Sequence, residues 1–210
     1  MHTVAISYGD GGANFFWHTP LKPFYRIVLP MFFALSGFLV AGSFERCKTI
    51  GLFIGLRAIR IYPALIVEVC VSALLLGPLL TEYSWSKYFS DIQFWQYLLN
   101  VTGHIHYLLP GVFLNNPIPD TVNGQLWTVP YELICYIFLI VAALAGVLNN
   151  RVVAVIAFGV LTAATSIFRV VSYRGKAPDF NESDLGGLHA FPGAALPLCF
   201  LAGVLLYSRP

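Results

Sequence analysis

The chain has 210 residues, of which 58% are hydrophobic and only 10% are charged, and its mean hydropathy is +0.74. A soluble domain carries roughly 25% charged residues, so this composition excludes a water-soluble globule and indicates an integral helical membrane protein. The net charge of +2, without any basic run, gives no reason to expect a nucleic-acid partner. We therefore predict an all-α fold, a polytopic transmembrane helix bundle, with one membrane domain over residues 1–210.

Five apolar segments are long enough to cross a hydrocarbon core of about 30 Å. They are residues 28–44, 61–80, 127–148, 152–172 and 190–207. The connection between the first two carries Arg46, Lys48, Arg57 and Arg60 against the single acid Glu45. The positive-inside rule makes this connection cytoplasmic and, by alternation, places residues 81–126 outside. Arg174 and Lys176, in the predicted outer loop 173–189, count against this orientation.

The first residues have the pattern expected for the second half of a helix. We expect no signal peptide, because a basic start followed by an apolar region is missing. His2 precedes a short apolar stretch that runs into a turn at residues 8–10. Imidazole titrates near neutral pH, so His2 is a candidate base. A disordered chain end is the alternative for this residue.

Residues 32–39 (FFALSGFL) interrupt a bulky apolar span with Ser36 and Gly37. Small residues allow two helices to approach closely. Mere tolerance by the bilayer explains equally well the small residues of this span, which are Ala34, Ser36, Gly37, Ala41 and Gly42. For Ser36 and Gly37, close approach of a ligand to the backbone is the functional alternative, and helix packing is favoured over it.

Residues 57–63 (RAIRIYP) place Arg57 and Arg60 three residues apart, on one face of a helix at the cytoplasmic start of the second span. Two guanidinium groups there form a rigid, permanently charged clamp for phosphates. The alternative is an orientation signal in contact with lipid headgroups.

Residues 81–126 form an extracytoplasmic loop that is too long for a plain connector and is rich in aromatic side chains typical of the membrane interface. We predict a short interfacial or re-entrant helix between Phe94 and Leu109, followed by irregular structure. His104 and His106 have a spacing that does not share a helix face, so no metal pair is expected there. We expect the four cysteines to be small core residues without disulfide or zinc.

Glu132 stands at the mouth of an uncharged apolar run that extends to residue 148. An ionisable group inside a membrane segment is by default a functional-site hypothesis. Pro130 suits a helix start, so we expect Glu132 in the first helical turn, where a plain structural acid is the alternative. Trp127 and Tyr131 are expected to anchor at the membrane interface.

Together, residues 32–39, 57–63 and 123–132 (NGQLWTVPYE), preceded by residues 2–9, resemble the membrane-bound acyltransferase 3 family, in its bacterial branch that acylates sugars of surface or exported polysaccharides. The resemblance implies an acyl-CoA-dependent O-acyltransferase of the bacterial inner membrane, which moves an acyl group, usually acetyl, to a hydroxyl of a carbohydrate or lipid-linked glycan. It implies acyl-CoA as co-substrate, with no tightly bound cofactor and no metal.

The resemblance also assigns roles to individual residues. It implies His2 and Glu132 as catalytic residues, and Arg57, Arg60 and Tyr62 as the acyl-CoA-binding group. It implies Ser36, Asn123 and Trp127 as substrate or structural support. Glu132 could orient the histidine, raise its basicity or hold a sugar hydroxyl, and the sequence leaves these three roles open.

The number of spans departs from the family, whose members have about twice as many, so we expect a chain shortened at both ends. An inactive partial acyltransferase is therefore one alternative. A transporter or flippase fragment is another, because an intramembrane carboxylate lies next to interrupted helices. A structural module that depends on a partner is the third.

Overall fold

The computed structural model describes residues 20, 22–116, 119–173 and 195–207, and His2 lies outside this part of the chain. The described residues are mostly helical and contain no strand, which confirms the all-α prediction. The long helices are α2 (Lys22–Arg46), α3 (Ile50–Cys70), α7 (Thr128–Leu144) and α8 (Arg151–Tyr173). A π-helix, η1 (Val71–Leu76), and the short α4 (Gly77–Leu80) prolong α3.

Four helical segments are long and apolar enough to cross a membrane, which makes this a multi-pass membrane protein. They are Ile27–Arg46, Ile50–Leu80, Gly124–Leu144 and Arg151–Phe168. The fifth predicted span is described only as α9 (Ala195–Tyr207), a helix of 13 residues. The remainder of that prediction lies outside the described residues.

The second span begins earlier than predicted, at Ile50 instead of residue 61. Arg57 and Arg60 therefore lie inside α3 and not in a loop. Residues 50–56 are apolar helix formers apart from two glycines, and an arginine can keep its charge at the membrane surface while its stem lies along an apolar helix. The two arginines lower the local hydropathy without ending the helix.

The outer loop is more helical at its start than predicted and less helical later. It contains α5 (Trp85–Ser90), α6 (Ile92–Leu98) and the 3₁₀-helix η2 (Leu99–Thr102). The prediction of one helix from residue 94 to residue 109 was thus right about the presence of a helix and wrong about its bounds. Helical structure stops at Gly103, which adopts φ +88°, a left-handed conformation that often ends helices.

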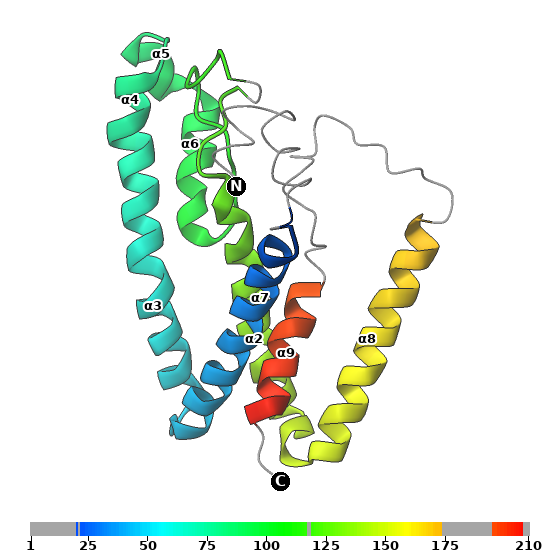
Figure 1. Ribbon diagram of the computed structural model, residues 1–210. Helices are drawn as coiled ribbons and strands as arrows, with labels where there is room; N and C mark the ends of the chain where they lie inside the picture. Colours follow the sequence, from blue (N-terminus) through cyan, green and yellow to red (C-terminus); the bar gives the residue numbers. More distant parts are fainter. Residues whose placement is uncertain (1–19, 21, 117–118, 174–194, 208–210) are drawn as a thin grey trace. The chain divides into compact units, whose positions relative to one another are not determined.

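The described residues divide into two compact units: those of residues 51–130 form unit 1, and those of residues 20–50 and 131–207 form unit 2. In unit 1, α6 packs against η1, and α5 and α6 lie beside the α4 end of the long helix (Figure 1). Leu65, Val69 and Ala73 from the long helix form a core with aromatic residues of α5 and α6. Tyr88 and Phe94 meet edge to face, with ring centroids 5.4 Å apart.

The segment between η2 and the 3₁₀-helix η3 (Gly124–Trp127) is irregular but firmly hydrogen-bonded. The Leu109 amide donates to the Asp120 carbonyl over 2.8 Å, and the Val122 amide donates to the Tyr107 carbonyl over 2.8 Å. These backbone bonds bring the end of the loop back alongside its middle. They hold residues 121–123 in place immediately before η3 begins.

Unit 2 is built on the close packing of α2 against α9. A Cβ atom on Gly37 would collide with the Phe200 backbone, and one on Gly203 would collide with the Ala34 carbonyl. Gly37 thus lies against Phe200 while Gly42 lies against Tyr207, so the two helices run in the same direction, as five alternating spans require (Figure 1). The small residues of residues 32–39 serve close helix packing and not mere bilayer tolerance.

Candidate functional site

A cluster of four polar side chains lies in unit 1, on and beside the membrane-spanning helix α3–η1. Asn123 donates through Nδ2 to the Ser72 hydroxyl over 2.6 Å and to the Tyr97 hydroxyl over 2.8 Å. The Ser72 hydroxyl in turn donates to Glu68 Oε1 over 3.5 Å. Gln125 donates to Asn123 Oδ1 over 3.1 Å. We call Glu68, Ser72, Tyr97 and Asn123 the polar cluster.

The π-helix determines where Ser72 points. The Gly77 amide donates to the Ser72 carbonyl, five residues back, and the altered register requires other partners for nearby carbonyls. The hydroxyl of the fully buried Tyr88 donates to the Ala73 carbonyl over 2.8 Å. Burial raises the pKa of Tyr88 to about 12, with a smaller contribution from Tyr97, so this phenol stays protonated and remains a donor. A side chain on Gly77 would collide with the Tyr88 ring.

Asn123 adopts φ +57°, in the left-handed region. Asparagine is one of the few residues that enter this region at low cost. The left-handed conformation turns the chain into η3 while its amide binds Ser72 and Tyr97. Burial also raises the pKa of Tyr97, and its hydrogen bonds to Ser72 and Asn123 act in the opposite direction.

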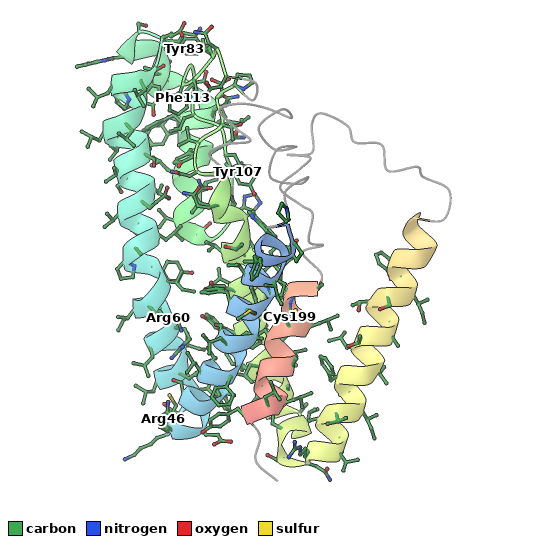
Figure 2. The ribbon with its side chains drawn as sticks, in the orientation of Figure 1. Arg46, Arg60, Tyr83, Tyr107, Phe113 and Cys199 are labelled. Atoms are coloured by element: carbon green, nitrogen blue, oxygen red, sulfur yellow. The ribbon has the colours of Figure 1, made fainter. Side chains whose placement is uncertain are left out.

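The predicted acyl-CoA-binding residues lie together on α3. The Arg57 guanidinium stacks 5.5 Å from the centre of the Phe53 ring, Arg60 is exposed, and Tyr62 is half-buried. Within unit 1, Arg60 lies toward one end, while Tyr83 and Phe113 lie at the opposite end (Figure 2). Arg57 precedes Glu68 by eleven residues, or about three helical turns, so both lie on nearly the same face of α3.

Two predictions about residues 127–132 were wrong. Trp127 is buried, with 6% of its surface exposed, and does not project outward as an interfacial anchor. Glu132 lies in the second turn of α7 and not the first, because the helix already begins at Thr128, before Pro130. Pro130 in the first turn agrees with its predicted place. Glu132 is half-buried.

The structure brings some of the predicted site residues together and leaves others apart. It brings Asn123 into contact with Ser72 and Tyr97, and it aligns the arginines on one helix. Ser36 is buried, with 5% of its surface exposed, on the helix that packs against α9. The roles of all these residues stay predictions.

Glu68, Ser72 and Tyr97 were not among the predicted residues. A signal for Glu68 was present, because it is the only charged residue in the predicted span 61–80. No comparable signal marked Ser72 and Tyr97, which join the cluster through the π-helix and the fold of the loop.

His104 and His106 lie in a non-helical segment, where their ring nitrogens approach to 2.9 Å. Partial burial lowers the pKa of His106, and the neighbouring His104 lowers it further. Within the described ranges, no group of three or more His, Cys, Asp or Glu side chains is placed to hold a metal ion. The four cysteines are free thiols, and Cys135 alone is buried.

Fold and site together define a class: a multi-pass helical membrane protein with a polar cluster on a spanning helix. The sequence matches the acyltransferase domain family, the acyltransferase 3 family, over residues 1–210, and the chain belongs to this family. It is 32% identical over 127 residues to a curated protein of Shigella phage Sf6 called "O-acetyl transferase", a match that covers 55% of this chain and 34% of that protein. The match therefore spans about a third of the relative's length. No solved structure matches the chain.

Proposed function

We propose that this chain takes part in the transfer of an acyl group, acetyl in the simplest case, from acyl-CoA to a hydroxyl of a surface or exported carbohydrate. The reaction belongs at the inner membrane of a bacterium, with the donor on the cytoplasmic side. The family membership and the name of the phage relative support this proposal. The observation that carries it is the alignment of Arg57 and Arg60 on the spanning helix α3.

The arginines suit the phosphates of coenzyme A. Guanidinium groups stay charged and bind phosphate oxygens in pairs. Arg57 is held against the Phe53 ring and is therefore ordered before any ligand arrives, whereas the exposed Arg60 is open to a ligand from outside the helix. Tyr62, half-buried two residues further on, adds a ring and a hydroxyl beside them.

The chemical step needs one proton transfer. The acceptor oxygen attacks the thioester carbonyl, an oxygen ester forms, and the carbon–sulfur bond breaks to release coenzyme A. His2 takes the proton of the acceptor hydroxyl and returns it to the departing thiolate. Glu132 supports this histidine or the acceptor.

The test is acetyl transfer in membranes that contain the protein. Radiolabelled acetyl-CoA is the donor, and the acceptor is surface polysaccharide of the host strain, stripped of its esters with mild alkali. We expect His2→Ala and Glu132→Ala each to abolish transfer, while Glu82→Ala, which removes an exposed loop carboxylate, preserves it. Full ester formation in both site variants would contradict the proposal.

The three roles of Glu132 give different results with Glu132→Gln. Loss of orientation of His2 lowers kcat at every pH. A role in raising the basicity of His2 shifts the acidic limb of the pH–rate profile to lower pH, because the histidine pKa falls. A role in holding a sugar hydroxyl raises the acceptor KM and leaves the donor KM unchanged.

A further inference from the structure

The carboxylate of Glu68 is incompletely hydrogen-bonded within the polar cluster. Its Oε1 accepts only a long hydrogen bond of 3.5 Å from Ser72. Its Oε2 is buried and has no hydrogen-bond partner within the part of the chain that the structure describes. A buried carboxylate oxygen without a donor is costly, so this position calls for one.

Asn123 and Ser72 have already used their donors, whereas Tyr97 accepts from Asn123 and does not use its own O–H within the cluster. Both hydrogen bonds from the Asn123 amide nitrogen go to Ser72 and Tyr97, and its carbonyl oxygen accepts from Gln125. The Ser72 proton is directed at Glu68. What the cluster still offers is the Glu68 acceptor and the Tyr97 O–H. A fitting ligand must therefore donate an O–H or N–H group to Glu68 and can accept from Tyr97, as a sugar hydroxyl does.

The backbone around the cluster is irregular on both sides. Ser72 lies in a π-helix, and Asn123 is held in the left-handed region. Such conformations are retained where the surrounding structure stabilises them, and they cluster at functional sites. Here the buried Tyr88 and the side-chain-free Gly77 hold the π-helix in place.

The separation of Glu68 from Arg57 along α3 matches the length of the acyl-CoA arm. Glu68 follows Arg57 by eleven residues, which corresponds to about 16 Å of helix. The phosphopantetheine arm of coenzyme A has about thirteen bonds between phosphorus and sulfur, and an extended chain of that length reaches about 15 Å. A donor whose phosphate binds at Arg57 therefore brings its thioester to the level of Glu68, where the acceptor hydroxyl must also lie.

We propose that Glu68, supported by Ser72, Tyr97 and Asn123, binds hydroxyl groups of the carbohydrate acceptor and positions one of them beside the thioester. This inference rests on the proposed function and assigns an acceptor site to it. Glu68 acts here as a binding and positioning group, and the proton still goes to His2.

Kinetics of acetyl transfer in membranes test the site. Glu68→Gln keeps the size and one acceptor oxygen but removes the charge, and Asn123→Gly keeps the left-handed backbone but removes the amide. We expect both to raise the acceptor KM about tenfold, the effect of losing one hydrogen bond to a charged group, with the acetyl-CoA KM unchanged. The melting temperature should stay unchanged in Glu68→Gln, whereas Asn123→Gly should melt lower because it loses the hydrogen bonds to Ser72 and Tyr97. The matched control Glu82→Gln keeps the wild-type values.

Two kinetic results would overturn the inference. A raised acetyl-CoA KM with an unchanged acceptor KM would assign the cluster to the amides of pantetheine. Wild-type kinetics in Glu68→Gln would leave Glu68 as a structural acid. If Glu68→Gln melts at a lower temperature, Ser72→Ala provides the second variant, and it must show the same increase in acceptor KM.

A binding measurement separates this inference from the proposed function. Protein in lipid nanodiscs is mixed with the ester-free polysaccharide, and saturation-transfer difference NMR reports contact without turnover. Binding that Glu82→Gln keeps and Glu68→Gln loses supports the site even if acetyl-CoA is not a donor, a result that would contradict the proposed function alone. Absence of binding by the wild-type protein would refute the site.

Discussion

Gly37 and Gly203 should be the positions in unit 2 where one added methyl group lowers the free energy of unfolding most. A Cβ at either position collides with backbone of the facing helix, which cannot rotate away as a side chain can. Overpacking of this kind costs about 1–3 kcal/mol, while alanine recovers about 1 kcal/mol of helix propensity. We expect Gly37→Ala to destabilise the protein by up to about 2 kcal/mol, and a chain of this size then melts up to about 8 °C lower.

Gly159→Ala in α8 is the matched control, because nothing lies within 4 Å of a Cβ there. It should gain up to about 1 kcal/mol of helix propensity and melt slightly higher in the same detergent, as measured by scanning fluorimetry. The double variant Gly37→Ala/Gly203→Ala should lose less than the sum of the single losses, since one separation of α2 and α9 relieves both collisions. A melting temperature for Gly37→Ala equal to that of Gly159→Ala would refute the packing argument.

Three further outcomes follow from the described residues. Arg60→Lys keeps the charge but loses the paired donors, so we expect the acetyl-CoA KM to rise about tenfold with the acceptor KM unchanged, and an unchanged donor KM would exclude Arg60 from the phosphate site. Tyr88→Phe deprives a carbonyl of the π-helix of its donor and should destabilise unit 1 by about 1–3 kcal/mol, whereas Tyr83→Phe should melt like the wild type. The lowered pKa of His106 means that the unfolded chain binds its proton more readily. The neutral His106 imidazole therefore contributes to the stability of the folded state above a pH of about 6.5, the pKa in the unfolded chain. This contribution is lost as the pH falls through the lowered pKa of the folded state. Acidification from pH 7.5 to pH 5 should then lower the melting temperature by the equivalent of less than about 1 kcal/mol, because the group is partly exposed. His106→Gln should remove this component, and an unchanged pH dependence in that variant would refute it.

The spans could be predicted from sequence because a bilayer requires about twenty consecutive apolar residues. Four of the five predicted spans correspond to helices of sufficient length. Their bounds were harder to predict, since helices extend beyond the apolar core. The arginines of α3 reduce the local hydropathy, so the predicted span began at residue 61 and missed the first eleven residues of the helix.

The candidate site could be predicted only in part, because its contacts depend on tertiary structure. Asn123 was recognised from its motif, but its partners Ser72 and Tyr97 lie 51 and 26 residues away in the sequence. Residues 71–76 contain no sequence pattern that predicts a π-helix. The π-helix is stabilised by a contact distant in sequence, the hydrogen bond from the buried Tyr88. Glu68 could have been found by the same rule that drew attention to Glu132.

The parallel packing of α2 and α9 has a consequence for biosynthesis. Gly37, which packs against Phe200, and Gly203, which packs against Ala34, are separated by about 165 residues. At 5–20 residues per second a ribosome needs roughly 8–30 s to make the second after the first. During that interval the glycine face of α2 is in the membrane without its partner. The bundle is therefore assembled late, after the intervening spans have been inserted, and α2 must wait in lipid or in the insertion machinery until α9 arrives.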